Sequence, residues 1–144
     1  MNNYEKAMQI LAERFGCDTL LSLATTDGNR PSVRIVDSYY EDCSFYAVTH
    51  SLSNKMMQIA ANPEVGVCGE WFTGHGIGEN LGHVLIESNA EMMSKLRAVF
   101  AEWYDNGHVD EKNPNTCLLR IRLTDGVLFN EGTKYIIDFT NRTA

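Results

Sequence analysis

Three strand-like segments joined by two tight turns constrain the fold of this chain more than any other feature. Residues 18–26 (DTLLSLATT) are rich in Leu and Thr, and they end at the turn signal Asp27-Gly28-Asn29. A second segment at residues 31–40 is separated from a third, residues 43–49 (CSFYAVT), only by a turn at residues 41–42. Strands joined by such short turns pair antiparallel. This part of the chain is therefore predicted to form an antiparallel meander.

The rest of the chain is predicted to alternate between helices and further strands. Apolar residues at helical spacing predict helices at residues 3–15, 53–61 and 88–106, the last of them opened by a capping box at residues 88–91. Further strands are expected at residues 64–71, 81–87, 116–123, 127–130 and 134–139. A turn at Asp125-Gly126 is expected to separate the strand at 116–123 from the strand at 127–130.

The glycine-rich segment at residues 72–80 (FTGHGIGEN) allows two interpretations. Its G-x-G-x-G pattern resembles a nucleotide-binding loop, but no dinucleotide-binding βαβ unit surrounds it. We interpret it as a mobile connection, with a ligand loop as the alternative.

The balance of these elements indicates a mainly β protein. Strands outnumber helices, and tight turns link successive strands, which favours an antiparallel β-barrel, closed or partly closed, with helices packed outside. With 144 residues, the chain has the size of one domain and can bury about two thirds of its unfolded surface. We therefore expect a single domain that spans residues 1–144.

Charge and composition argue against several classes of function. The chain carries 12 basic and 19 acidic residues, a net charge of -7, and no segment gathers Lys and Arg into a stripe. Nucleic acid and anionic membrane are therefore poor partners. The first 16 residues have neither a signal-peptide pattern nor an uninterrupted apolar span. The four cysteines lack zinc-ligand spacing and are expected to be free thiols, so we expect a cytoplasmic protein without a metal site.

Two cations stand where local rules disfavour a positive charge. Arg34 interrupts an apolar, β-branched run, and Lys55 lies in the first turn of a predicted helix, at the positive end of its dipole. Departures from local rules tend to mark functional positions. The hydroxyls of Thr49, Ser51 and Ser53 precede the same helix end, whose free N–H groups can hold an anion. We therefore expect a pocket for a phosphate or another anion.

The order and spacing of several segments resemble the pyridoxamine 5′-phosphate oxidase-like flavoproteins, in particular their small general-stress-type and nitroimidazole-reductase-like members. The resemblance is carried by residues 25–34 (TTDGNRPSVR) and 45–63 (FYAVTHSLSNKMMQIAANP), and it extends to Gly82-His83-Val84 and residues 135–139 (YIIDF). It covers nearly the whole chain. It implies a split β-barrel, a homodimer, and FMN bound at the subunit interface.

The resemblance also implies which residues hold the cofactor. Arg34 and Lys55 match positions that hold the FMN phosphate, whereas Asn54 stands where the family often has an arginine, so one phosphate cation is missing. The apolar strand residues match positions along the flavin ring and the ribityl chain. The expected cofactor-binding residues are Val33, Arg34, Ile35, Val36, Val48, Thr49, Ser53, Asn54 and Lys55.

The resemblance favours an oxidoreductase but leaves its substrate open. The chain shows no C-terminal Arg-x-His, with which the true oxidase of the family grips its substrate, so oxidation of pyridoxamine 5′-phosphate is not expected. The leading hypothesis is an FMN-dependent enzyme that reduces a small cytosolic compound with electrons from NADH or NADPH. The alternative is a flavin- or haem-binding carrier or sensor without turnover. No catalytic side chain stands out, and His50 and His75 are the histidines to test.

Dimer formation would also cover the apolar surface that a barrel with few helices leaves exposed. The aromatic strand residues Tyr39, Tyr40 and Phe45 are candidates for that surface, with a place in the core as the alternative. The two interpretations differ in whether these rings are exposed in the monomer.

Overall fold

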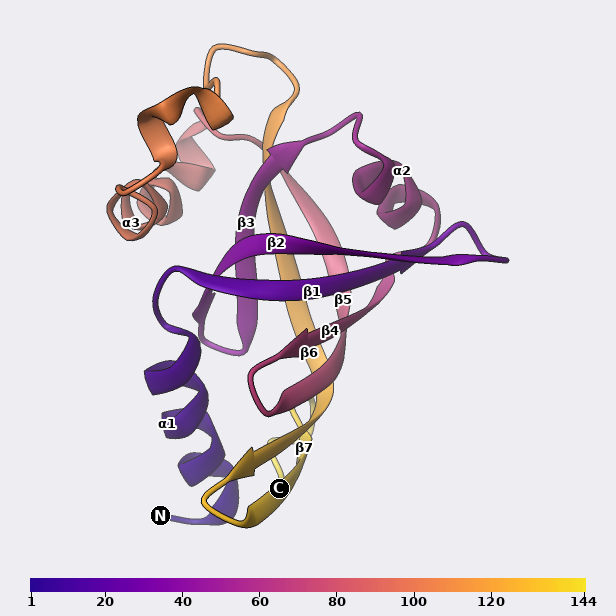
Figure 1. The fold of residues 1–144 in the computed structure, drawn as a ribbon, viewed down its shortest axis with the longest axis vertical. Coiled ribbons are helices and arrows are strands. Elements are labelled where there is room, and N and C mark those ends of the chain that lie inside the picture. The colour runs from indigo at the N-terminus through magenta and orange to yellow at the C-terminus, as the bar shows by residue number, and fades with distance from the viewer.

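One antiparallel sheet of seven strands dominates the computed structural model, which describes all 144 residues (Figure 1). The strands are β1 (Thr19–Thr26), β2 (Pro31–Glu41), β3 (Ser44–His50), β4 (Glu64–Gly69), β5 (Phe72–His83), β6 (Thr116–Asn130) and β7 (Thr133–Asp138). They follow in the order β3-β2-β1-β4-β5-β6-β7, and β3 also pairs with β6, which closes the first six into a barrel. The prediction of a mainly β protein built on an antiparallel barrel is confirmed.

Helices cover the barrel near its two ends (Figure 1). Helix α1 (Asn3–Phe15) packs on β2 and β7, and α2 (Asn54–Ala61) packs on β1 and β5 towards the opposite end. A 3₁₀ turn (Glu87–Asn89), α3 (Ala90–Val99) and a π-helical turn (Tyr104–His108) lie near the same end as α2. None of these helices combines the length and the apolar character that crossing a membrane requires.

Aromatic rings form the centre of the barrel core. Phe15 of α1 packs on Phe45 and Phe72, with ring centroids 5.6 and 5.9 Å away. A second, smaller core lies under α3, where Leu96 and Phe100 are fully buried. All four cysteines are free thiols, so burial of apolar side chains stabilises the fold without a disulfide.

The local signals of the first 63 residues are realised closely. Asn2 caps α1 through a capping box with Glu5. The Asp27-Gly28-Asn29 turn joins β1 to β2, and a turn at residues 42–43 with positive φ joins β2 to β3. Helix α2 ends before Pro63, since the residue that precedes a proline is pushed out of the α region.

The glycine-rich segment is part of strand β5, so its interpretation as a mobile connection was wrong. A Cβ atom on Gly74 or Gly76 would lie within 2.9 or 2.8 Å of a carbonyl oxygen of β6, and one on Gly78 within 2.9 Å of Ile59. Only glycine lets these backbones approach so closely. The pattern that resembled a loop therefore reflects packing between neighbouring elements.

The predicted turn at Asp125-Gly126 does not form, because β6 continues through it as one strand. His75 pairs with Asp125 and Gly76 pairs with Leu123, which leaves Thr124 as an extra residue in a bulge. The two predicted strands at residues 116–123 and 127–130 are thus two halves of β6. Pairing with β5 on one side and β7 on the other overrides the local turn signal.

The segment between β5 and α3 also differs from the prediction. No strand forms at residues 81–87 beyond His83, and the expected capping box is absent, since Asn89 instead donates its side-chain N–H groups to the carbonyls of Leu81 and His83. The helix expected to continue to residue 106 ends at Val99, and the separate π-helical turn follows.

The aromatic strand residues belong to the core rather than to an open surface. Tyr40 and Phe45 are buried, and Tyr39 is half-buried against the core under α3. The alternative that placed them in the core is the correct one. The exposed apolar residues of this part of the sheet are Leu20, Val33 and Ile35.

Candidate functional site

Strands β2 and β3 separate along most of their length, and the gap between them forms the site. They pair only over Tyr39–Glu41 and Ser44–Tyr46. Beyond these pairs β2 stays on β1, and β3 stays on β6. The facing edges of β2 and β3 therefore present backbone N–H and C=O groups that have no strand partner and are free to bind a ligand.

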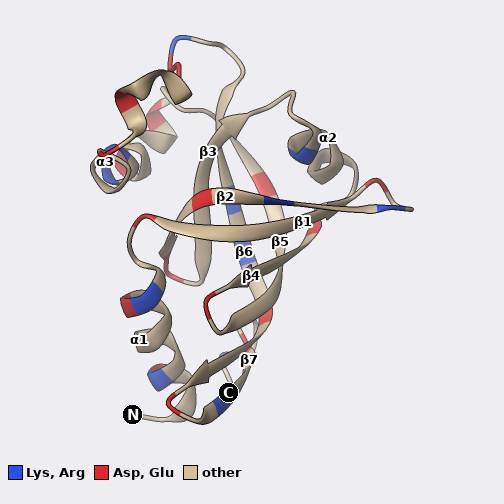
Figure 2. Ribbon diagram, viewed as in Figure 1, with Lys and Arg blue, Asp and Glu red and all other residues tan.

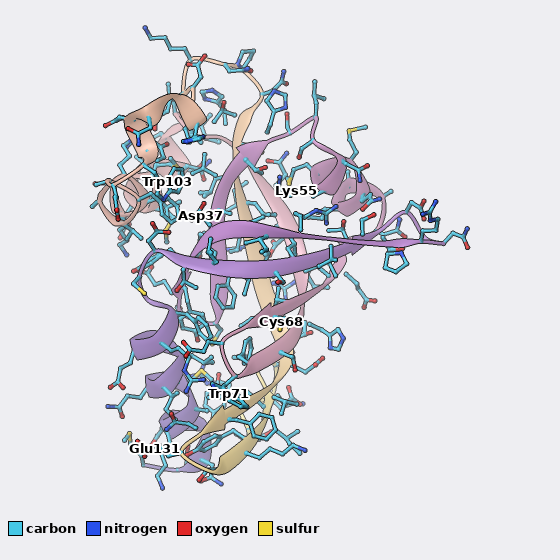
Figure 3. All side chains as sticks on the ribbon, viewed as in Figure 1. Asp37, Lys55, Cys68, Trp71, Trp103 and Glu131 are labelled. Carbon is cyan, nitrogen blue, oxygen red and sulfur yellow. The ribbon has the colours of Figure 1, made fainter.

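A cavity of about 390 Å³ occupies this gap. Its size is typical of a small-molecule site. Strands β2 and β3, helix α2 and the region of the π-helical turn supply its walls: Ile35, Val36, Asp37, Ala47, Val48, Thr49, Lys55, Trp103, His108 and Val109. Figure 3 shows Asp37 and Trp103 next to each other, with Lys55 further along on α2. The cavity thus combines apolar walls with one cation and one carboxyl group.

Lys55 and Arg34 bring two positive charges together without an acidic partner. Burial, followed by the charge of Arg34, lowers the pKa of Lys55. Neither cation forms an ion pair within 4 Å, whereas the five ion pairs of the chain all involve other residues. In Figure 2 the blue segment of α2 lies next to the blue segment of β2. Two neighbouring cations without a carboxylate form a site for an anion.

Arg34 is held in place through one nitrogen of its guanidinium. Nη1 donates to the carbonyls of Leu23 and Ser32 at 3.2 and 3.3 Å and to Thr25 Oγ1 at 2.6 Å. The Thr25 hydroxyl in turn donates to Gln58 of α2 at 2.5 Å. Nε and Nη2 have no hydrogen-bond partner, so these donors remain available to a ligand beside Lys55. Burial lowers the pKa of Arg34, but an arginine stays charged at any ordinary pH.

Ser53, the N-cap residue of α2, carries a buried hydroxyl without a hydrogen-bond partner. It makes no capping bond to the helix, and the first turn of α2 contains no acidic residue. A buried, unsatisfied polar group costs about 1–3 kcal/mol, so such groups usually have a partner in the functional state. An anion that binds the free N–H groups of α2 and the two cations would supply that partner.

The structure brings most, but not all, of the predicted site residues together. Ile35, Val36, Val48, Thr49 and Lys55 line the cavity, and Arg34 and Ser53 lie next to its cationic end.

Val33 and Asn54 lie apart from the cavity. Val33 is exposed over a separate groove on the outer face of β1, β4 and β5, and Asn54 is exposed at the start of α2. The alternation of side chains along a strand puts Val33 and Ile35 on the same face, but only Ile35 reaches the gap between β2 and β3.

Five residues that line the cavity were not among the predicted site residues: Asp37, Ala47, Trp103, His108 and Val109. Trp103 falls within the helix predicted at residues 88–106, and residues 108–109 lie outside every predicted helix and strand. Asp37 ends the same apolar run that Arg34 interrupts, so the rule that singled out Arg34 could also have found it.

Asp37 lies against a second carboxyl group. Burial raises the pKa of Asp37, and the charge of Asp18 and a hydrogen bond between the two side chains raise it further, whereas His108 lowers it. The indole N–H of Trp103 donates to Asp18 Oδ2 at 2.8 Å. This bond connects the loop before β1 to the wall of the cavity.

The two histidines that were candidates for testing do not line the cavity. His50 Nδ1 accepts the backbone N–H of Leu52 at 3.2 Å, which is a local turn interaction. His75 Nδ1 lies 2.8 Å from Asp125 Oδ1 on the outer face of β5 and β6. Neither is placed to act on a ligand between β2 and β3.

Comparison with known proteins finds relatives among solved structures only, since no protein-family model and no curated protein matches the chain. A NimC/NimA family protein from Clostridium acetobutylicum has a TM-score of 0.68 at 16% identity, covering 93% of this chain and 96% of its own. A FAD-binding protein from Mesorhizobium loti has a TM-score of 0.65 at 17% identity, covering 82% and 90%. A Clostridium acetobutylicum protein of the pyridoxinephosphate oxidase family, related to general stress protein 26, has a TM-score of 0.63 at 12% identity, covering 96% of each chain.

The fold is the split β-barrel of the pyridoxamine 5′-phosphate oxidase-like proteins. The resemblance carried by residues 25–34 and 45–63 is thereby confirmed at the level of the fold. At identities this low the neighbours establish the architecture, and the ligand and the reaction have to be argued from the residues of the site.

Proposed function

We propose that this chain is a flavoprotein that holds FMN in the cavity between β2 and β3 and acts as an oxidoreductase on a small substrate. The observation that carries the proposal is the pair of cations without acidic partners, Arg34 and Lys55, beside the partnerless hydroxyl of Ser53. This cluster borders an apolar cavity. A phosphate attached to a large, flat ring system suits both features, and a single cationic cluster suits the one phosphate of FMN. The presence of a FAD-binding protein on the same fold supports a flavin.

In this proposal the chain binds and orients the cofactor. Arg34, Lys55 and the Ser53 hydroxyl hold the phosphate, and the walls at Ile35 and Val48 exclude water from the ring. The unpaired backbone groups of β2 are available to polar atoms of the ring. A bound flavin supplies hydride transfer, which explains why the cavity needs no triad or metal of its own. NADH or NADPH is the proposed electron donor, and free thiols fit a reducing cytosol.

An absorption spectrum and anaerobic reduction test the proposal. The purified protein, incubated with FMN and freed of excess by gel filtration, should keep equimolar flavin, and NADH or NADPH should bleach its visible bands. Failure to retain FMN would overturn the proposal. FMN that binds but is reduced by neither nucleotide would favour the carrier or sensor, and a Soret band in the purified protein would point to haem.

We also propose that a second copy of the chain covers the cavity. Leu20, Val33 and Ile35 of neighbouring strands β1 and β2 are 64%, 71% and 66% exposed, which is unusual for adjacent apolar side chains on a sheet. Ile35 also lines the cavity. A homodimer formed through this face would bury these side chains and shield a bound flavin from solvent.

A further inference from the structure

Asp37 is the only carboxylic acid among the residues that line the cavity. It lies two residues along β2 from Ile35, and Figure 3 shows Trp103 next to it. His108 lines the same cavity. Lys55 and Arg34 form the cationic end of the site, which the proposed function assigns to the phosphate. Asp37 therefore faces the part of the cavity that the phosphate leaves free.

A second carboxyl group lies close to Asp37. Asp18, from the loop between α1 and β1, raises the pKa of Asp37 through its charge and through hydrogen bonding, and Asp18 Oδ2 accepts the indole N–H of Trp103 at 2.8 Å. Asp18 is exposed, whereas Asp37 is half-buried. Burial and a neighbouring carboxyl group both disfavour the ionised form of a carboxylic acid. Both effects favour the protonated form of Asp37, on the side of the cavity.

We propose that Asp37 is the proton donor of the reduction carried out in this cavity. The inference rests on the proposed flavin function and adds to it. A substrate double bond that receives a hydride at one atom needs a proton at the other. The O–H bond of Asp37 breaks as the new bond to hydrogen forms on the product, and Asp18 returns a proton from solvent to the Asp37 carboxylate. A bound reduced flavin would supply the electrons, and the nicotinamide nucleotide would reduce it again.

The charged groups around Asp37 set the pH range in which it can donate. Its pKa is raised by burial and by Asp18, and lowered by His108 of the π-helical turn. Lys55 of α2 lines the same cavity without contributing to this shift. A raised pKa keeps a larger fraction of Asp37 protonated as the pH rises towards neutrality. Reduction should therefore slow as the pH increases through the pKa of Asp37.

The first test follows the carboxyl pair without any turnover. The indole N–H signal of Trp103 can be assigned by NMR in a Trp71→Phe background, because the chain has only two tryptophans. In the full chain this signal should titrate with a midpoint above the ordinary aspartate value of about 3.9. Asp37→Asn should move the midpoint to lower pH, whereas Asp125→Asn, a control on the outer face, should leave it unchanged. A titration unaffected by Asp37→Asn overturns the proposal.

The second test separates proton delivery from electron transfer. The reduced, FMN-loaded protein is reoxidised without oxygen by menadione, which takes up protons, or by ferricyanide, which takes up electrons alone. Asp37→Asn should slow the reaction with menadione by about 10²-fold, the usual contribution of a general acid, and slow the reaction with ferricyanide by much less, both measured on protein saturated with FMN. An unchanged menadione rate, or a loss that appears in His108→Gln instead, overturns the proposal. If FMN does not bind, the proposed function and the donor role both fail, and the titration shows separately whether the carboxyl pair exists.

Discussion

The start of α2 combines groups that are each unfavourable in the absence of a ligand. Ser53 buries a hydroxyl without a partner, and Lys55 is partly desolvated next to the positive charge of Arg34. Local costs of this kind are found at functional sites, where the surrounding structure stabilises them. At these residues, stability and ligand binding are expected to respond to mutation in opposite directions.

Replacing Lys55 by alanine should weaken FMN binding without destabilising the protein. The pKa of Lys55 is lowered in the folded state, so its charge destabilises the fold below that pKa, and the cost is relieved as the pH rises from there towards the ordinary lysine value of 10.5. The melting temperature of the FMN-free protein at pH 7 should stay the same or increase. Loss of one charge-assisted bond to the phosphate should raise the Kd by about 10- to 150-fold.

Fluorescence titration with FMN and thermal unfolding measure both effects. Lys6→Ala removes the same charge from an exposed position on α1 and serves as the control, with the Kd expected to stay within twofold. If Lys55→Ala binds FMN as tightly as the parent protein, the phosphate site lies elsewhere.

Ser53→Ala tests the orphaned hydroxyl in the same way. Because Ser53 makes no capping bond, the usual cost of losing an N-cap does not apply, and removing an unsatisfied buried group should raise the free energy of unfolding by about 1 kcal/mol. FMN should bind about 10-fold more weakly. Ser51→Ala is the matched control, since Ser51 Oγ donates to Asn115 at 3.3 Å. The control should lose stability and keep its affinity, and the reverse pattern would contradict the assignment.

At the scale of elements, strands β5 and β6 depend on glycines where side chains would not fit. A Cβ at Gly76 would lie 2.8 Å from the carbonyl oxygen of Arg122, whereas one at Gly66 would make an ordinary 3.7 Å contact with Ala24. Gly76→Ala should therefore lower the free energy of unfolding by about 1–3 kcal/mol, as overpacking does. Gly66→Ala should change it by less than about 0.5 kcal/mol. Urea unfolding compares the two variants, and equal stabilities would mean that β5 and β6 are less closely packed than described.

At the scale of the whole molecule, the open edge of the cavity is the reason for proposing that a second copy covers it. Val33→Glu places a charge on the proposed dimer face, and burying an unpaired charge there would be costly. Sedimentation equilibrium should show a dimer for the parent and a monomer with weaker FMN binding for this variant. Ile136→Glu changes a residue of similar exposure, 67%, on β7, and should remain dimeric. A parent that is monomeric while FMN stays bound would refute the shared site.

The sequence by itself determined the elements whose signals act over a few residues. The Asp27-Gly28-Asn29 turn formed as predicted, and the cap of α1 by Asn2 and the end of α2 before Pro63 are equally local, because turn and cap chemistry is settled between near neighbours. The anion-binding character of the start of α2 is likewise a prediction from the sequence, which the Lys55 and Ser53 variants test. Five predicted residues line the cavity for this reason, since they lie on strands and a helix whose positions the local signals set.

Only the tertiary structure decided the features that join residues distant in the sequence. Asp125-Gly126 carries a turn signal, yet it lies within β6 because β5 and β7 satisfy its backbone on both sides. The glycine-rich segment of β5 lacks the local pattern of a strand. Its glycines are required because the backbone of β6 and the side chain of Ile59 lie too close for a Cβ atom. Asp18 and Asp37 are brought together by the pairing of β1 with β2, whereas the bond from Trp103 to Asp18 joins residues 85 positions apart. Local chemistry therefore determined the cationic start of α2, and long-range pairing determined which residues face it across the cavity.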